Sequence, residues 1–439
     1  MRIAIDGYNL AMPQGTGVAT YGYGLAEALK ELGHQVEGVF GIAVGADPAL
    51  KEIRFFEALG RTTKPLSGKA LLYRRAREFP VNFFGARVGP VPSSAFVEKR
   101  VFEKRLPAFD RIHTAGRLFE RAERYFQLTG RFLSVRMMDP PDIMHWTYPL
   151  PLKLEGARNI YTLHDLVPLR LPYTTLDVKR YYHALVKRCV AEADHIVTVS
   201  ESSRRDIELI FGTPRGGITN TYQSAPMPPE LSDQDRAADA ASIEGIFGLK
   251  LQGYFLYFGA IEPKKNLGRL IEAYLSLMTE TPLVIVGGRS WQSEDELKLI
   301  TPQGAQGGIV NRLAGRIVRL DYLPRTLLMR LVRGAKAVTF PSLYEGFGLP
   351  VLEAMQLGVP VLTSNTSSLV EVAGDASVMV DPYDIRAIAG GLAALDSDAD
   401  LRSRIERGAL SHGAQLPSQP ALAAEYGVAL LTVRPAIEL

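Results

Sequence analysis

The most informative part of the sequence runs over residues 340–354, which read Phe340-Pro341-Ser342-Leu343-Tyr344-Glu345-Gly346-Phe347-Gly348-Leu349-Pro350-Val351-Leu352-Glu353-Ala354. An apolar run that ends at Pro341 is typical of a buried strand. Gly346 and Gly348 allow another group to approach the backbone closely, and Pro350 suits the first turn of a helix. Free N–H groups at the start of that helix favour an anion such as a diphosphate. The stretch therefore predicts a strand, a glycine loop and a helix that together form an anion site.

Two carboxylates stand in the same stretch, Glu345 in the loop and Glu353 in the helix. At this spacing both can face one cleft, where carboxylates accept hydrogen bonds from sugar hydroxyls. The alternative is that Glu345 only caps the helix and that Glu353 is a solvated helix residue. The residues alone leave both interpretations open.

The sequence on either side alternates short apolar strands with amphipathic helical patterns. The strands are expected at 3–5, 36–44, 143–146, 160–163, 195–199 and 218–222, and then at 254–258, 283–286, 316–320, 337–341, 360–363 and 377–380. Such alternation predicts parallel sheets that helices cover on both faces. A proline-rich run at 224–229 and an acidic, alanine-rich stretch at 233–239 indicate a linker between two sheets.

The fold class is therefore α/β, with two Rossmann-like parallel-sheet domains that face a cleft, because ligands bind at the carboxyl ends of such strands. The 439 residues divide into a first domain at 1–225, a second domain at 250–416 and a helical segment at 417–439 that returns to the first domain. Residues from about 48 to 138 do not follow the alternation. They are expected to form an insertion in the first domain, with a basic helical pattern at 96–126.

The composition excludes several classes of protein. Hydrophobic residues make up 46% of the chain and charged residues 22%, which is unlike a disordered, collagenous or coiled-coil protein. The single cysteine, Cys189, excludes an intramolecular disulfide and every cysteine-based metal cluster. Asp6 interrupts the apolar start where a signal peptide would continue, and no apolar run reaches the ~18 residues of a membrane span. We therefore expect a cytoplasmic protein, and the seven histidines show no metal-ligand spacing.

The charge is unevenly distributed along the chain. Residues 61–136 hold 17 Lys and Arg against 6 Asp and Glu, a net +11, although the whole chain carries only +3. The same residues include 11 Phe and Tyr. Such asymmetry indicates an anionic partner, for which membrane headgroups, phosphorylated ligands and nucleic acid are candidates. No nucleic-acid motif accompanies the charge, so nucleic acid is not expected.

Residues 254–274 contain a second strand–turn–helix pattern. A strand that ends at Phe258 is followed by a turn at Gly259 and by Lys264-Lys265-Asn266 at the start of a helix. Cations are unfavourable at a helix N-terminus unless they share an anion with it. The lysines are either ordinary surface residues or phosphate ligands, and the adjacent glycine turn favours phosphate ligands.

These motifs resemble those of the retaining glycosyltransferases of family 4, which have the GT-B fold. The resemblance rests on Glu345-x7-Glu353 within its glycine-rich setting, and on Glu262-Pro263-Lys264-Lys265-Asn266. It covers residues 142–412 well and the first 45 residues in part. It implies an enzyme that moves a sugar from a nucleotide diphosphate donor to an acceptor hydroxyl. The first domain would hold the acceptor and the second domain the donor.

The resemblance also implies a role for each residue of the motifs. Lys265 would bind the donor diphosphate, Glu345 the sugar hydroxyls and Glu353 the ribose. Backbone amides around the phosphates would come from Gly346, Phe347, Gly348 and Leu349.

One position departs from the family pattern. Many relatives have Gly-Arg after the first strand of the second domain, whereas this chain has Gly259-Ala260. Lys264, which the resemblance places with the donor, and Arg289 are the candidates to supply the missing positive charge.

In the first domain, the candidate residues follow two strands. His164 and Asp165 end the strand at 160–163, and a lone histidine there is more often a buried core residue. The resemblance instead implies that His164 and Asp165 lie beside the acceptor, with His164 near the reacting carbon. Gly15-Thr16-Gly17 follows the first strand and can be a flexible turn. By resemblance, Gly15 would instead contact the acceptor and Gly17 the donor. This segment is not a dinucleotide fingerprint, because Thr20 occupies the third glycine position.

The sequence thus predicts a retaining hexosyltransferase whose catalytic group is His164, Glu345 and Lys265. It is expected to need neither a metal nor another cofactor. The resemblance suggests GDP-mannose as the donor, with UDP- and dTDP-sugars and GDP-fucose as alternatives. The acceptor is expected to be a growing bacterial surface glycan, free or lipid-linked. Two other interpretations of these motifs remain. One is a nucleotide-sugar epimerase or phosphorylase of the same fold, and the other is a non-catalytic carbohydrate- or nucleotide-binding protein.

The basic, aromatic residues 61–136 are expected to touch an anionic membrane, which would make the enzyme peripheral at the inner face of the plasma membrane. The alternative is that their aromatic side chains pack onto their own domain while the arginines are solvated.

Overall fold

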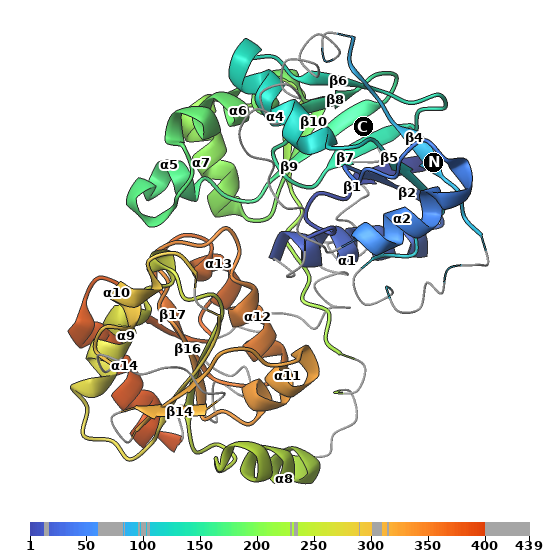
Figure 1. Cartoon of the computed structure of the whole chain (residues 1–439). Helices are drawn as coiled ribbons and strands as arrows, with labels where there is room; N and C mark the ends of the chain where they lie inside the picture. The colour runs from blue at the N-terminus through green and yellow to red at the C-terminus, as the bar shows by residue number, and fades with distance from the viewer. Residues whose placement is uncertain are drawn as a thin grey trace.

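The computed structural model describes residues 1–12, 17–59, 82, 84–94, 97, 102, 106–228, 231, 236–288, 290–300, 310–313 and 316–399. These residues form two α/β bodies that a single light-green segment joins in Figure 1. The predicted segment at 417–439 lies outside the described residues, as do Gly15 and Arg289.

The first body is built on an eight-stranded sheet in the order β11-β10-β9-β7-β1-β2-β5-β4. Its strands are β1 (Arg2–Asp6), β2 (Gln35–Phe40), β4 (Gly89–Val91), β5 (Arg111–Thr114), β7 (Ile143–Trp146), β9 (Arg158–Leu163), β10 (His195–Thr198) and β11 (Ile218–Asn220). Every pairing is parallel except that of the edge strand β4 with β5. The expected parallel sheet is therefore present.

Helices and a small second sheet complete this body. The helical segments are α1 (Gly17–Glu31), η1 (Pro48–Leu50), α2 (Lys51–Ala58), α4 (Leu118–Thr129), α5 (Val167–Arg170), η3 (Pro172–Thr174), α6 (Lys179–Glu192) and α7 (Glu201–Phe211). Three further strands, β3 (Ala86–Arg87), β6 (Leu133–Arg136) and β8 (Leu152–Leu154), form the parallel sheet β3-β6-β8. The inner strands of the main sheet, β1, β2, β7, β9 and β10, are buried on both faces. Ile3 and Ile5 of β1 pack in one hydrophobic cluster with Leu25 of α1, whereas Ala4 belongs to a second cluster with Leu118 of α4.

The stretch from about 48 to 138 does not stand apart from the sheet. Its strand β5 pairs in parallel with β2 and extends the main sheet beyond the strands that the sequence pattern revealed. Within the described part of this stretch lie η1, α2 and α4, and α4 at 118–129 begins near the end of the basic pattern expected at 96–126. Leu118, Ala122 and Phe126 recur at helical spacing on its buried face, and this apolar period sets the helix.

The second body has a seven-stranded sheet in the order β14-β15-β13-β12-β16-β17-β18. Its strands are β12 (Phe255–Phe258), β13 (Leu283–Val286), β14 (Val310–Leu313), β15 (Ile317–Leu320), β16 (Ala337–Phe340), β17 (Val361–Ser364) and β18 (Val378–Val380). Its helical segments are α8 (Arg236–Phe247), η5 (Pro263–Lys265), α9 (Leu267–Leu275), α10 (Ser293–Leu297), α11 (Arg325–Arg333), α12 (Leu349–Gln356), α13 (Leu369–Ala373) and α14 (Ile385–Ser397). All six expected strands are present to within one residue at each end, and β14 adds an antiparallel edge.

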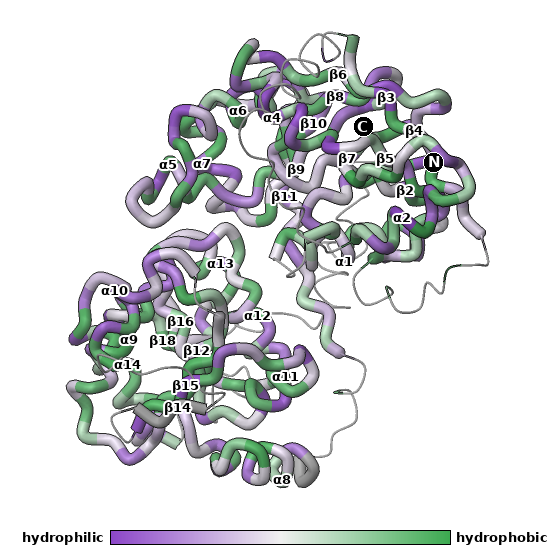
Figure 2. The backbone as a smooth tube through the Cα atoms, viewed as in Figure 1, coloured by the Kyte–Doolittle hydropathy of each residue, from purple (hydrophilic) through white to green (hydrophobic). Residues whose placement is uncertain are grey.

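Helix α8 occupies part of the stretch that the sequence suggested as a linker. Figure 2 shows hydrophobic and hydrophilic residues alternating along it. Ile243 and Phe247, one helical turn apart, are buried in the same cluster as Tyr254, and Asp239 pairs with Arg333 of α11. Because α8 packs on the second body, the connection that crosses between the bodies precedes this helix.

Candidate active site

The donor-side residues meet where β12 and β16 end. These strands are neighbours in the sheet, so the segments that follow them lie at the same edge. Nζ of Lys265, in η5, lies 2.6 Å from Oε1 of Glu345, in the loop after β16. Glu345 is only 6% exposed, and burial acts to raise the pKa of its carboxyl. The charges of Lys265 and Lys264 outweigh burial, and the pKa of Glu345 is lowered, so this carboxylate is ionised.

Lys264 adds a second positive charge to this cluster. Its Nζ lies 3.5 Å from Oε1 of Glu262. Burial opposes its charge, but Glu345, Asp165 and Glu262 together raise the pKa of Lys264 above its ordinary value. Asp165 follows β9 of the first body, so its electrostatic effect on Lys264 acts across the two bodies. Lys264 thus stands in the same charge cluster as Glu345, whereas Arg289, the other candidate for the missing positive charge, lies outside the described residues.

Hydroxyl and amide side chains hold the Glu345 loop in place. Nδ2 of Asn266 donates to the carbonyl oxygens of Pro341 at 2.9 Å and Pro382 at 2.7 Å. Oγ of Ser367 accepts from the backbone N–H of Glu345 at 3.0 Å. Oγ of Ser368 lies 2.9 Å from the carbonyl oxygen of Glu345 and is fully buried. Sequence reasoning missed both serines, although they follow β17 at the same edge of the sheet.

Glu353 is a buried residue of α12 and not a solvated one, since it is 6% exposed. Its Oε1 lies 2.9 Å from Nη2 of Arg325, the first residue of α11. Burial raises the pKa of Glu353, and the charge of Arg325 opposes that rise. Nη2 of Arg325 also donates to the carbonyl oxygen of Pro226 in the connection between the bodies. Arg325 was not among the sequence candidates, although it follows the end of β15 by only a few residues.

Gly346 and Gly348 have no side chain, so other parts of the protein can come close to the loop at these two positions. A Cβ at Gly346 would lie 2.6 Å from the carbonyl oxygen of His164, so this glycine lets the first body approach the loop. Gly348 has a φ of +108° and begins α12, and among the described residues no side chain caps that helix start. A Cβ at Gly17 would lie 3.8 Å from Leu349, which places the start of α1 beside the start of α12. Phe347 lies between the two glycines and is buried.

His164 is held by hydrogen bonds at both ring nitrogens. Its Nε2 lies 2.9 Å from the carbonyl oxygen of Thr147, which can only accept, so Nε2 carries the proton. Its Nδ1 lies 3.0 Å from Nε2 of Gln223, which donates to it. Burial lowers the pKa of His164, and the ring is therefore neutral near pH 7. In this arrangement contacts within the chain engage both ring nitrogens of His164.

Asp165 shares the edge of the first sheet with His164. Its Oδ1 accepts from the N–H of Val167 at 3.0 Å, and its carbonyl oxygen accepts from the hydroxyl of Tyr182 at 2.8 Å. Asp165 is thereby fixed beside Gly346, whose hypothetical Cβ would lie 3.0 Å from that of Asp165. The structure thus brings His164 and Asp165 together with the Glu345 loop.

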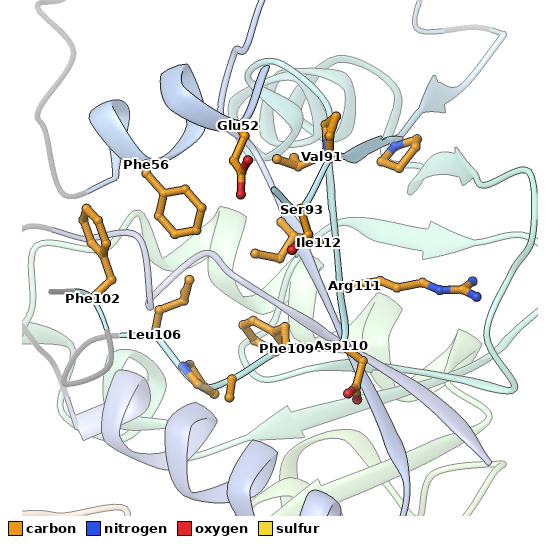
Figure 3. Close-up of a pocket in the computed structure, with 14 residues that line it drawn as sticks. Glu52, Phe56, Val91, Ser93, Phe102, Leu106, Phe109, Asp110, Arg111 and Ile112 are labelled. Carbon is orange, nitrogen blue, oxygen red and sulfur yellow. The ribbon is translucent and has the colours of Figure 1, made fainter. Parts of the chain in front are cut away.

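A cavity of about 390 Å³ lies elsewhere in the first body (Figure 3). Its lining is mostly apolar and includes Phe56 of α2, Val91 of β4 and Phe109 before β5. Phe109 and Ile112 stand at the amino end of β5, whereas His164 follows the carboxyl end of β9. The cavity's described lining therefore includes none of the expected site residues.

Within the described ranges, no three His, Cys, Asp or Glu side chains are grouped so that they could hold a metal ion. No helix in the described part of the chain is long and apolar enough to span a bilayer.

Family models match both bodies of the chain. The family model described as "Glycosyl transferases group 1" matches residues 248–412, and the model described as "Glycosyltransferase Family 4" matches residues 15–219. Together they cover both bodies, and the chain belongs to the family 4 glycosyltransferases. A third model, "Bacterial regulatory proteins, gntR family", matches residues 398–439, nearly all of which lie outside the described ranges.

Individual relatives point to sugar transfer. The chain is 37% identical over 246 residues to "O-antigen chain mannosyltransferase B" of Escherichia coli, a match that covers 54% of this chain and 61% of the relative. It is 29% identical over 257 residues to "Serotype-specific mannosyltransferase WbdA" of Escherichia coli, covering 55% of this chain and 30% of that relative. The matches thus span less than two thirds of either relative's length.

Among solved structures, Anabaena Alr3699/HepE in complex with UDP-glucose matches with a TM-score of 0.60. The match has 13% sequence identity and covers 100% of both chains. At this identity it shows the fold alone, and the expected GT-B fold is confirmed.

Proposed function

We propose that this protein transfers mannose from a nucleotide diphosphate donor, GDP-mannose, to a hydroxyl of a growing surface glycan, with retention of the anomeric configuration. The observation that carries this proposal is the part-buried Lys265–Glu345 pair, which stands with Lys264 directly against the His164–Asp165 edge of the first body. The two relatives named as mannosyltransferases support the choice of sugar.

Lys264 and Lys265 stabilise the leaving diphosphate in this mechanism. Both cations stand at the carboxyl edge of the second sheet beside the uncapped start of α12, where N–H groups add positive potential. The two lysines and the N–H groups are therefore already in place to stabilise the negative charge that develops on the departing phosphate. Such preorganised electrostatic stabilisation is usually the largest single contribution to catalysis. Because two lysines supply this charge, transfer does not require a metal ion.

Glu345 and Glu353 orient the donor. Lys265 keeps Glu345 ionised despite burial, so its carboxylate is ready to accept hydrogen bonds from sugar hydroxyls. Glu353 accepts from the ribose and shares that contact with Arg325. Both nitrogens of His164 are engaged within the chain, so a phosphate oxygen of the leaving group takes the proton from the acceptor hydroxyl.

We further infer that the acceptor is a glycan carried on a lipid and that the enzyme works in the cytoplasm at the inner face of the plasma membrane. The charge of residues 61–136 supports attachment to anionic headgroups. The described aromatic residues of this stretch differ in exposure. Phe119, Phe126 and Phe132 are buried, whereas Phe84 is 78% exposed. Attachment then depends mainly on the basic residues, part of which lie outside the described ranges.

A donor panel tests the proposed function. The purified protein is incubated with GDP-mannose, GDP-fucose, UDP-glucose or dTDP-rhamnose and a mannose oligosaccharide on an apolar aglycone, and products are identified by mass spectrometry. Extension by one mannose from GDP-mannose alone is expected. Conversion of a nucleotide sugar to its epimer without acceptor would instead establish an epimerase. Stabilisation by GDP with no product from any donor would indicate a binding protein.

A further inference from the structure

Helix α7 of the first body makes direct bonds to the loop that carries Glu345. The hydroxyl of Tyr344 donates to the carboxylate of Asp206, and Asp206 also lies 3.4 Å from Nε of Arg170. Tyr344 is 8% exposed and Asp206 is 7% exposed, so this bond is buried. Tyr344 immediately precedes Glu345, so α7 constrains one end of the Glu345 peptide.

Ser203 of α7 constrains the other end. Its Oγ lies 2.8 Å from the carbonyl oxygen of His164 and 3.3 Å from the carbonyl oxygen of Gly346. The side chain is fully buried, and one hydroxyl proton is shared between the two carbonyl groups. Ser203 therefore links the acceptor-side histidine to the residue that follows Glu345.

A third contact joins α7 to α13 of the second body. The carboxylate of Glu371, in α13, accepts from the backbone N–H groups of Glu201 at 2.9 Å and Ser202 at 2.8 Å. A carboxylate of the second body thus caps the first turn of a helix of the first body, which is favourable in both charge and hydrogen bonding. Glu371 follows Ser367 and Ser368, which hold the backbone of Glu345.

These three contacts define an interdomain clasp, formed by residues 201–206 of α7 with Tyr344, Gly346 and Glu371. The residues on both sides of Glu345 are bonded to the first body, although Glu345 itself belongs to the second. Separation of the two bodies would break every contact of the clasp. Its strength comes from bonds between bodies and not from contacts with a nucleotide.

We propose that the interdomain clasp positions Glu345 for sugar transfer, so that the carboxylate is correctly placed only while α7 contacts the Glu345 loop. This inference rests on the proposed function and extends it to residues that touch neither donor nor acceptor. Tyr344, Asp206, Ser203 and Glu371 are positioning residues. Misplacement of a reacting group by about 1 Å costs up to a hundredfold in rate, so such residues affect turnover strongly.

The test compares Tyr344→Phe, Asp206→Ala, their double variant and Ser203→Ala with the wild-type protein. We expect kcat to fall about tenfold to a hundredfold in each single variant. The dissociation constant for GDP, measured by calorimetry, should stay within about twofold, because the lysines and Glu353 are unchanged. The double variant should lose no more than Asp206→Ala alone, since both changes remove the Tyr344–Asp206 bond and Asp206→Ala also removes the contact with Arg170.

Glu371→Gln and Glu208→Gln form a matched pair for the same test. Glu371 contacts α7 from the second body, whereas Glu208 belongs to α7 and its described ion pair is with Arg204 of the same helix, so Glu208→Gln should keep wild-type kcat. Any of three results would overturn the proposal. The first is an unchanged kcat in Tyr344→Phe and Glu371→Gln, and the second is an equal loss of kcat and of GDP affinity. The third is additive effects in the double variant. Thermal unfolding of each variant shows whether it still folds, so that a loss of kcat is not confused with misfolding. Ser203→Ala is the smallest of these changes and serves as the test if a larger change prevents folding.

Small-angle scattering distinguishes failure of this inference from failure of the proposed function. Without ligand, Glu371→Gln and Tyr344→Phe should show a larger radius of gyration than Glu208→Gln, because the bodies separate more easily. If no donor gives a product, the proposed function fails while a larger radius still supports the clasp. A radius equal to that of the wild-type protein overturns the clasp whatever the activity.

Discussion

Nζ of Lys265 lies 2.6 Å from Oε1 of Glu345, although 80 positions separate the two residues in the chain. They meet because β12 and β16 are adjacent strands whose carboxyl ends share one edge of the sheet. The pair is part-buried, with Glu345 only 6% exposed, so each charge depends on the other for its stability. A diphosphate bound at Lys265 would therefore alter the charge around Glu345 in the same event, which would couple donor binding to the residue that we propose orients the sugar.

Removal of the Lys265 ammonium should abolish most transfer. Lys265→Ala takes away a charge-assisted contact to the leaving diphosphate and leaves Glu345 buried with less compensation. We expect a loss of about 2–4 kcal/mol in transition-state stabilisation, or roughly 30- to 1000-fold in kcat/KM. Steady-state kinetics with GDP-mannose measures it. Lys250→Ala, at an exposed position of the same body, is the control, and equal activity of the two variants would refute the assignment.

The two glutamates should give different kinetic signatures. Glu345→Gln should lower turnover while GDP affinity stays close to that of the wild-type protein, because Glu345 faces the sugar. Glu353→Gln should mainly weaken GDP binding, because the ribose loses a charged acceptor and Arg325 loses its partner. Calorimetry with GDP and initial rates separate the two effects. The opposite pattern would show that the roles are exchanged.

Much of the fold could be predicted from the sequence, because strands of a parallel sheet are short continuous apolar runs with recognisable turns between them. The twelve expected strands coincide with strands of the two main sheets, and the Glu345 and Lys265 motifs fall at their carboxyl edges. Strand β5 was missed because its residues, Arg-Ile-His-Thr at 111–114, lack an apolar run and are recognised only through their pairing with β2.

The supporting residues of the site could not be predicted in the same way. Ser367, Ser368 and Glu371 act through bonds to backbone groups that are distant in sequence, and hydroxyl and acidic residues are common in any loop. The engagement of both nitrogens of His164 depends on Thr147 and Gln223, which no local pattern connects to it. Local periodicity predicts elements, whereas these contacts follow from the register between elements.

Asp6 should make stability depend on pH. Its carboxylate accepts from the N–H and hydroxyl of Thr147, whose carbonyl oxygen accepts from His164. Burial, only partly opposed by these hydrogen bonds, raises the pKa of Asp6 from 3.8 to about 6. Between these pH values the folded state binds a proton that the unfolded state has lost. The contribution of Asp6 to the free energy of unfolding therefore falls as pH rises from about 4 to 6 and stays reduced above that.

Asp6→Asn removes this titration. Relative to the wild-type protein, the variant should gain stability with rising pH across that interval, by up to about 3 kcal/mol for a difference of roughly two pKa units. Urea denaturation at intervals from pH 4 to pH 7.5 measures the difference. A difference that is flat with pH, or that changes in the opposite direction, would show that Asp6 is ionised at the lower pH in the folded protein.

Transfer should be independent of divalent metal. Lys264 and Lys265 already place two cations at the expected diphosphate site, so the leaving group needs no further positive charge. Initial rates in excess EDTA should equal those in buffer containing Mg²⁺ after chelator is removed by dialysis. Loss of activity in EDTA that Mg²⁺ restores would contradict the lysine-based mechanism.

The basic stretch should bind anionic membranes. Residues 61–136 carry a net +11, and each basic residue near an anionic surface contributes about 1 kcal/mol, so a few contacts suffice for reversible attachment. Phe84, which is 78% exposed, adds an apolar group that can enter the interface. The buried positions of Phe119 and Phe126 show that other aromatics of the stretch serve the core instead. Attachment should therefore be mainly electrostatic and weaken as salt is added.

Liposome flotation tests this expectation. The protein should float with vesicles that contain phosphatidylglycerol and not with neutral vesicles, and binding should decrease between 50 mM and about 500 mM salt because the surface charge is screened. Charge reversal at Arg74, Arg75 and Arg77, which lie outside the described residues, should reduce flotation further than Phe84→Ser. Reversal of three exposed cations of the second body, Lys250, Lys298 and Arg386, is the matched control and should leave flotation unchanged. If the wild-type protein does not float at low salt, or if both triple variants lose binding equally, the basic stretch is not the membrane contact.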